Sequence, residues 1–180
     1  MRKTFLIFFV IITCLGCQES KEHKIDEAIF DFENFGRAPE ATEKHPINEV
    51  IKIFFDEWTF DDPYEPIAID IKNNEVYVNP SINIRGFRAD DSFQINDPEK
   101  VFEILEKYEV QSWKRDYTFE DPETYQDGYS WSLWLQFADG TVEKHSGEGT
   151  DAEKLTPDNF QEFAKELRSF VEEKLENADY

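Results

Sequence analysis

The sequence predicts an α+β fold, in which an antiparallel sheet built from two hairpins plus further strands packs against two main helices. Alternating apolar residues between turn signals predict the strands, and longer stretches with helical spacing predict the helices. The length of 180 residues suits one domain, and an aromatic content of 16% is sufficient for a buried core rather than a disordered chain.

The first hairpin is predicted from the alternation of apolar residues between positions 67 and 78. Asn73 and Asn74 interrupt this alternation, and two asparagines tolerate the positive φ angles of a type I′ loop. A loop formed by these two residues would pair the strands as follows: Lys72 with Glu75, and Ile71 with Val76.

The second hairpin has a stronger turn signal, Asp139-Gly140, between residues 129–137 and 141–146. Alternate residues of its first strand, from Tyr129 to Phe137, are large and apolar, and we expect this face to point to the core. A two-residue loop would pair the strands as follows: Ala138 with Thr141, Phe137 with Val142, Gln136 with Glu143, and Trp134 with His145.

Two further segments are rich in β-branched and aromatic residues, which is typical of strands. They comprise residues 50–60 and residues 110–119. The order along the chain is then strand, hairpin, helix, strand, hairpin and helix, which is consistent with an α+β domain.

Two helices are expected from their start signals. Asp97 is a candidate N-cap with Pro98 at the first helical position, and this helix would run to about Tyr108. Thr156 and Pro157 would begin the second helix. The apolar stripe of the second helix contains Phe160, Phe163, Ala164, Leu167, Phe170, Val171 and Leu175, and that of the first contains Val101, Leu105 and Tyr108.

The N-terminus carries a targeting signal. Arg2 and Lys3 precede an uninterrupted apolar run, Phe5–Leu15, which has about half the length that a membrane-spanning helix needs. The run ends at Gly16-Cys17, and residues 18–24 are polar. A basic start followed by a short apolar run is typical of a signal peptide rather than of a permanent membrane span.

The segment Cys14-Leu15-Gly16-Cys17 resembles the lipobox of bacterial lipoprotein precursors. In that class a small residue precedes an invariant cysteine, which is diacylated before signal peptidase II cleaves in front of it. Gly16 and Cys17 match these positions, whereas Cys14 stands where the class usually has leucine. The resemblance implies lipidation at Cys17 and a membrane-anchored lipoprotein in the bacterial cell envelope, facing the periplasm or the exterior. An ordinary signal peptide with an incidental Cys17 is the alternative.

Three parts of the chain are therefore expected. Residues 1–16 would be the lipoprotein signal peptide, residues 17–48 the lipidated cysteine with a polar tether and a short N-terminal helix, and residues 49–180 the single α+β domain. The short helix is predicted by the helical spacing of apolar residues between Ile25 and Phe35. Gly36 would end it.

The chain is strongly acidic, with 40 Asp and Glu against 19 Lys and Arg and a formal net charge of −21. Loss of Arg2 and Lys3 with the signal peptide would change the net charge to −23. Because the negative electrostatic potential of such a chain repels phosphate backbones, nucleic acid is not an expected partner. Acylation of Cys17 would leave the exported chain without a free cysteine, which excludes thiol catalysis, cysteine-bound zinc and disulfides.

No residue pattern in the sequence matches a catalytic or metal-binding motif, so neither an enzyme nor a cofactor is expected. The three histidines, His23, His45 and His145, are not spaced for a zinc site. A calcium loop of the EF-hand type in the acidic stretch after position 119 is broken by Tyr125 and Trp134 at ligand positions. No serine lies in a G-x-S-x-G motif.

Trp134 is the most informative candidate for a binding residue. It falls among small polar residues on the strand face opposite to the expected core face, and the predicted register places Gln136, Glu143 and His145 near it. Aromatic side chains on polar faces contact sugars or anchor protein partners. Alternatively, a helix or the predicted strand at 110–119 covers this face and buries Trp134.

A further pattern in the C-terminal half consists of turn, core and helix-start residues: Asp127, Gly128, Trp131, Leu133, Asp139, Gly140, Thr141, Gly147, Pro157, Phe160 and Phe163. This pattern resembles that of small uncharacterised bacterial secreted and lipoprotein domains. Because of the kinds of position involved, the resemblance implies a fold and no activity.

Together these observations favour a lipid-anchored acidic protein of the cell envelope that acts as a non-enzymatic binding or interaction module. Its expected contacts are the membrane, through the N-terminal lipid, and a basic protein, which negative charge would attract. A glycan-binding lipoprotein is one alternative, and a carboxylate-dependent hydrolase of the envelope is another.

Overall fold

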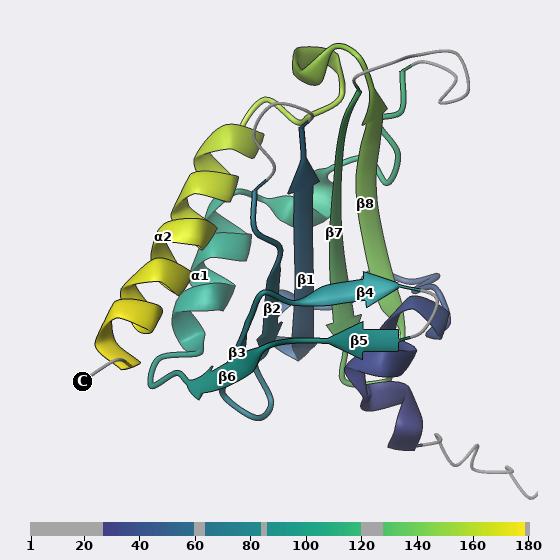
Figure 1. Cartoon of the computed structure of the whole chain (residues 1–180). Coiled ribbons are helices and arrows are strands. Elements are labelled where there is room, and N and C mark those ends of the chain that lie inside the picture. Colours follow the sequence, from purple (N-terminus) through teal and green to yellow (C-terminus); the bar gives the residue numbers. More distant parts are fainter. Residues whose placement is uncertain (1–26, 60–63, 84–85, 120–127, 179–180) are drawn as a thin grey trace, which may run out of the picture.

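The computed structural model describes residues 27–59, 64–83, 86–119 and 128–178, and it confirms the α+β class (Figure 1). The main sheet has six strands: β1 (Val50–Trp58), β2 (Ile67–Asp70), β3 (Glu75–Val78), β6 (Asp91–Gln94), β7 (Tyr129–Phe137) and β8 (Val142–Gly149). Their order is β6-β3-β2-β1-β7-β8, and every neighbouring pair is antiparallel. A second, two-stranded sheet pairs β4 (Ser81–Asn83) with β5 (Gly86–Arg88).

Two α-helices, α1 (Glu99–Lys107) and α2 (Phe160–Ala178), lie side by side along one flank of the sheet (Figure 1). The remaining helical elements are short 3-10 turns: η1 (Glu27–Phe30), η2 (Phe32–Arg37), η3 (Ile47–Glu49), η4 (Val110–Ser112) and η5 (Ala152–Lys154). In the described ranges, no helix is both long enough and apolar enough to cross a bilayer. Residues 1–26, with the apolar run and Cys17, lie outside these ranges.

The helix-covered face of the sheet holds the larger core. The apolar stripe of α2 contacts Phe55 of β1, whose ring meets Phe160 and Phe163 at centroid distances of 5.9 and 5.6 Å. All the predicted stripe residues of α2 from Phe160 to Val171 are buried, and Leu175 is half-buried. The predicted inward residues of α1 are buried as well. The helical periodicity of the sequence therefore identified this interface.

The opposite face of the sheet is covered by the N-terminal turns and by the β4–β5 hairpin. Phe32 and Phe35 of η2 are buried against Phe54 of β1 and Ala68 of β2, and Phe87 of β5 stacks on Phe32 with centroids 4.6 Å apart. The sheet is therefore buried on both sides. Residues 27–48, expected as part of the segment before the domain, pack directly on it.

The first hairpin has a longer turn than the sequence predicts. Asp70 pairs with Glu75 and Ile69 pairs with Val76, so residues 71–74 form the connection and the predicted pairing of Ile71 with Val76 is wrong. The Asp70 carboxylate accepts hydrogen bonds from the backbone and side-chain amides of Asn73, at 3.0 and 2.9 Å. These bonds stabilise the wider turn.

The second hairpin differs from its predicted register by one residue. Its loop comprises residues 138–140, with Gly140 at a φ of 86°, and Phe137 N–H donates to the Thr141 carbonyl at 2.9 Å. A three-residue loop of this kind requires a residue in the left-handed region, which glycine adopts freely. The strands pair as follows: Gln136 with Val142, Leu135 with Glu143, Trp134 with Lys144, and Leu133 with His145.

Residues 110–119 do not form the predicted strand within the sheet. They begin with η4 and continue as an extended segment along the outer edge of β8, where Ser146 N–H donates to the Arg115 carbonyl and Tyr117 N–H donates to the Ser146 carbonyl. Ala41 N–H likewise bonds the Val142 carbonyl at 2.9 Å. An edge strand needs such cover because its free backbone groups otherwise pair with other chains.

Three helix predictions are corrected, one in the type of helix and two at the helix start. The segment expected as a helix between residues 25 and 35 forms two 3-10 turns, with residue 25 outside the described ranges. Helix α2 begins at Phe160, three residues after Pro157, and the Thr156 hydroxyl bonds the Ala152 carbonyl instead of capping α2. Asp97 does not cap α1, because its carboxylate binds Lys174 of α2 at 3.0 Å.

Gly147 of β8 is needed for the connection that leads from the sheet to α2. The Trp131 indole N–H donates to the Leu155 carbonyl at 2.6 Å, directly over Gly147, and a β-carbon at this position would overlap both groups. Gly147→Ala should therefore lower the free energy of unfolding of the full chain by about 3 kcal/mol, through overpacking and loss of the buried hydrogen bond. Urea unfolding measures this change.

Gly36→Ala is the matched control, because a β-carbon at position 36 would lie 3.5 Å from the Trp134 ring, an ordinary contact. Its effect should stay within about 1 kcal/mol. Similar losses for both substitutions would contradict the steric argument.

Candidate functional site

The four residues that the sequence nominated for binding lie on opposite faces of the sheet. Trp134 and Gln136 point to the face covered by η1 and η2, whereas Glu143 and His145 share the helix-covered face with their partners Leu135 and Leu133. The expected single surface is thus wrong. The cause is the three-residue hairpin loop, since a register shift of one residue moves side chains to the other face.

Trp134 is half-buried rather than displayed on an open polar face. Its ring meets Phe35 and Phe54 at centroid distances of 5.8 and 5.9 Å, and the Lys144 ammonium lies 4.3 Å from the ring centroid. The element that covers Trp134 is η2, and not the segment 110–119. A sugar that stacked on the same face of the indole would first have to displace Lys144.

Gln136 holds the N-terminal turns against the sheet. Its side chain is fully buried, and its amide N–H donates to the Ile29 carbonyl of η1 at 2.8 Å. A side chain so enclosed is a structural contact rather than part of a ligand surface.

Glu143 and His145 form a buried pair beside the edge segment. His145 Nε2 lies 2.9 Å from the Glu143 carboxylate, its Nδ1 lies 3.0 Å from the Lys114 carbonyl, and Arg115 approaches Glu143 at 3.7 Å. A histidine beside a carboxylate can act as a general base only where a substrate can reach it. His145 is 1% exposed, so the pair attaches residues 114–115 to β8.

A second buried charge network links β1 to α2. The Glu57 carboxylate accepts a hydrogen bond from the Tyr129 hydroxyl at 2.7 Å and forms an ion pair with Arg168. Burial and the hydrogen bond to Glu57 raise the pKa of Tyr129 far above its usual value, so this hydroxyl stays protonated and donates. On its outer side, the Arg168 guanidinium stacks 3.9 Å from the Tyr64 ring centroid.

A third buried pair, Lys52 with Asp70, forms part of the wall of a cleft between η1, η2 and the sheet. The Lys52 ammonium also lies 4.8 Å from the Phe32 ring centroid. The cleft has a volume of about 690 Å³. Its acidic residues are Glu27, Asp31, Glu33 and Asp70, and it also contains Lys52 and Lys72, so much of its charge is compensated internally.

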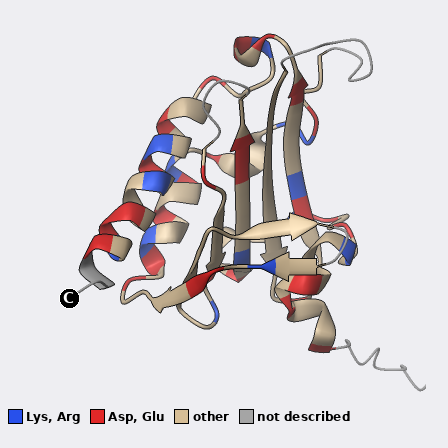
Figure 2. Ribbon diagram, in the orientation of Figure 1, with Lys and Arg blue, Asp and Glu red and all other residues tan. Residues whose placement is uncertain are grey.

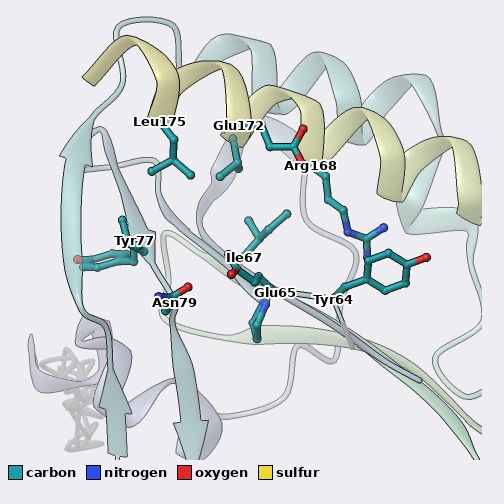
Figure 3. A pocket seen from close by; sticks show the side chains of 11 residues that line it. Tyr64, Glu65, Ile67, Tyr77, Asn79, Arg168, Glu172 and Leu175 are labelled. Atoms are coloured by element: carbon teal, nitrogen blue, oxygen red, sulfur yellow. The ribbon is translucent and has the colours of Figure 1, made fainter. Parts of the chain in front are cut away.

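An apolar hollow lies under the C-terminal half of α2, and we call it the α2 groove (Figure 3). Tyr64, Glu65 and Ile67 form one wall, on the segment that enters β2. Arg168, Val171, Glu172 and Leu175 of α2 form the other. Its volume is about 200 Å³, which suits one large side chain. Tyr64 at its end is 40% exposed.

The α2 groove was not predicted from the sequence, although the sequence contains one signal for it. Arg168 lies one helical turn after Ala164 and one turn before Val171, both of which are buried on the apolar stripe. A cation placed beside such a stripe needs a buried acidic partner, because an unpaired charge is costly to bury. Glu57 is that partner, but its position more than a hundred residues earlier could not be inferred from the pattern.

No metal centre is evident in the described part of the chain, where no three His, Cys, Asp or Glu side chains are grouped to hold an ion. The acidic stretch considered for an EF-hand loop falls largely on residues 120–127, which are outside it.

Lys107 and the Tyr108 hydroxyl bind Glu166, and these hydrogen bonds lower the pKa of Glu166. They join α1 to α2.

Comparison of the chain with protein-family models, with curated proteins and with solved structures found no match. A function for this chain is therefore inferred from its own chemistry.

Removing one charge of the Glu57–Arg168 ion pair should destabilise the fold more than removing both. Arg168→Met would leave the Glu57 carboxylate, which is 2% exposed, without its cation, and should cost about 3–5 kcal/mol of unfolding free energy. Glu57→Gln added to Arg168→Met should recover much of the lost unfolding free energy, because it removes the unpaired charge. Urea unfolding at neutral pH measures both variants, and an equal loss in the single and double variants would refute the charge argument.

Proposed function

We propose that this chain is an acidic lipoprotein of the bacterial cell envelope, anchored by acyl chains on Cys17, and that its folded body is a non-enzymatic binding module for a basic protein. The proposal rests chiefly on the charge of the chain, −21 in total. Figure 2 displays Asp and Glu on both helices and around the sheet. Negative potential over a whole surface speeds encounter with a cationic partner and discriminates against anionic ones.

Non-enzymatic action is supported by the way in which buried ionisable groups are used. The carboxylates of Glu57, Asp70 and Glu143 each bind a cation or histidine of this same chain. A catalytic group must instead be accessible to a substrate and free to exchange a proton with it. These groups stabilise the packing of the sheet with its neighbours.

Membrane attachment is supported by the basic start, the apolar run Phe5–Leu15 and the Gly16-Cys17 pair. Acylation would give each buried methylene group about 0.8 kcal/mol of membrane affinity, and several chains together anchor stably. Anionic headgroups would repel a body of net charge −23, as expected after removal of Arg2 and Lys3. The body would therefore remain available to a partner away from the bilayer surface.

Cys17→Ser should abolish incorporation of labelled palmitate in a bacterial host and move the protein out of the membrane fraction, because the acceptor thiol is lost. Cys14→Ser is the matched control, since Cys14 would be removed with the signal peptide, and it should keep both properties. Labelling of the Cys17→Ser variant would contradict lipidation at this residue.

Binding to a cationic probe should weaken with salt. The full lipidated chain, held in non-ionic detergent micelles, should bind a fluorescent oligolysine peptide but not an oligoglutamate peptide. Affinity should fall by about tenfold as ionic strength rises from about 0.01 to 0.1 M, because the Debye length shortens from about 30 to about 10 Å. Fluorescence anisotropy measures the affinity, and a failure to bind oligolysine at low salt would refute a basic partner.

A further inference from the structure

We propose that the α2 groove is the place where the basic partner docks, and that it receives the side chain of a lysine or arginine of that partner. This inference rests on the proposed function and adds the position and chemistry of the contact. The groove offers an apolar floor with carboxylates at its rim, and a long cationic side chain has the complementary structure, an apolar stem that ends in a charge.

The floor of the groove is apolar and of the right size. Ile67 and Val171 are buried in it, and Leu175 is half-buried beside them. The volume of about 200 Å³ is below the roughly 300–1,000 Å³ of typical small-molecule sites and suits one side chain. Interfaces gain most of their affinity from a few side chains that fill such pockets.

The rim of the groove is acidic on both walls. Glu65 and Glu172 are exposed, and Figure 3 places them on opposite walls. Among the described residues, neither of them forms an ion pair with a Lys or Arg of this chain. Their charges are therefore available to a cation that enters between them.

Arg168, the one cation among the described residues that line the groove, does not cancel this charge. Its guanidinium forms the buried ion pair with Glu57 and stacks on Tyr64. The charge of Arg168 is thus neutralised within the fold, and the two rim carboxylates give the groove a net negative charge. An acidic side chain would be repelled there, and a purely apolar side chain would leave the carboxylates without a partner.

The cleft beside η1 and η2 is less suited to the same partner. It is larger, and Lys52 and Lys72 lie in it together with its acidic residues. A cation entering that cleft would meet Lys72, since Lys52 is already paired with Asp70. The described lining of the α2 groove holds no cation besides Arg168, which is paired with Glu57.

The experiment uses the full lipidated chain in non-ionic micelles with oligolysine as the probe. Glu65→Lys combined with Glu172→Lys should weaken binding by about tenfold or more, because it reverses the charge of the rim. Glu162→Lys combined with Glu176→Lys is the matched control, since it changes the net charge by the same amount at two exposed acidic residues of the same helix that do not line the groove. It should weaken binding by less than about threefold.

A second probe tests the apolar floor without any change to the protein. An oligomer of diaminobutyrate carries the same charges on shorter stems, and at pH 6 it should bind about tenfold more weakly than oligolysine, because fewer methylene groups are buried. Methyl resonances of Val171 and Leu175 should shift on titration with oligolysine. The urea midpoint of each variant verifies that it is folded.

The outcomes separate this inference from the proposed function. If the unaltered chain does not bind oligolysine at low salt, both the basic partner and the groove are refuted. If it binds, but the rim variant loses no more affinity than the double control variant and both probes bind equally, the charge-based function stands and the groove is refuted. Loss specific to the rim variant, with preference for the longer stem, supports the groove.

Discussion

Burial of β1 on both faces is the constraint on which the rest of the structure depends. Four consecutive residues of this central strand, from Lys52 to Phe55, are buried. Because successive side chains of a strand point to opposite faces, neither face of the sheet can be left to solvent. Helices α1 and α2 cover the Phe55 side, and η1, η2 and the β4–β5 hairpin cover the Phe54 side.

This two-sided burial also explains the charge pairs within the fold. Lys52 and Glu57 are both buried on β1, and burying a charge without a partner beside it is costly. Asp70 of β2 neutralises Lys52, and Arg168 of α2 neutralises Glu57. The second pair contributes to the position of α2 on the sheet. It thereby shapes the α2 groove and leaves the rim carboxylates as the uncompensated charges there.

The acidity of the chain therefore has two roles. A few carboxylates, including Glu57, Asp70 and Glu143, are enclosed and bind cations or histidine of the same chain. Many others, such as Glu65 and Glu172, remain exposed and give the surface its negative charge. Sequence composition reports only the sum of the two groups. Their separation depends on which residues the fold encloses, and only the exposed group can attract a partner.

The sequence by itself determined the class of the fold, the principal helices and the inner faces of the strands, because helical and strand periodicity arise from local backbone geometry. The stripe of α2 and the inward face of β7 were predicted correctly on this basis. The two hairpin registers were not. Each depends on the length of a turn, which is set by contacts of Asp70 with Asn73 in one case and by the left-handed backbone of Gly140 in the other.

Only the tertiary structure decided where the candidate binding residues lie. A change of one residue in the β7–β8 loop separated Trp134 and Gln136 from Glu143 and His145, and distant contacts buried most of that set. The α2 groove, in contrast, combines residues about a hundred positions apart, such as Glu65 and Glu172. Local patterns indicate which face of an element is apolar, but a site made from two elements exists only after they have packed together.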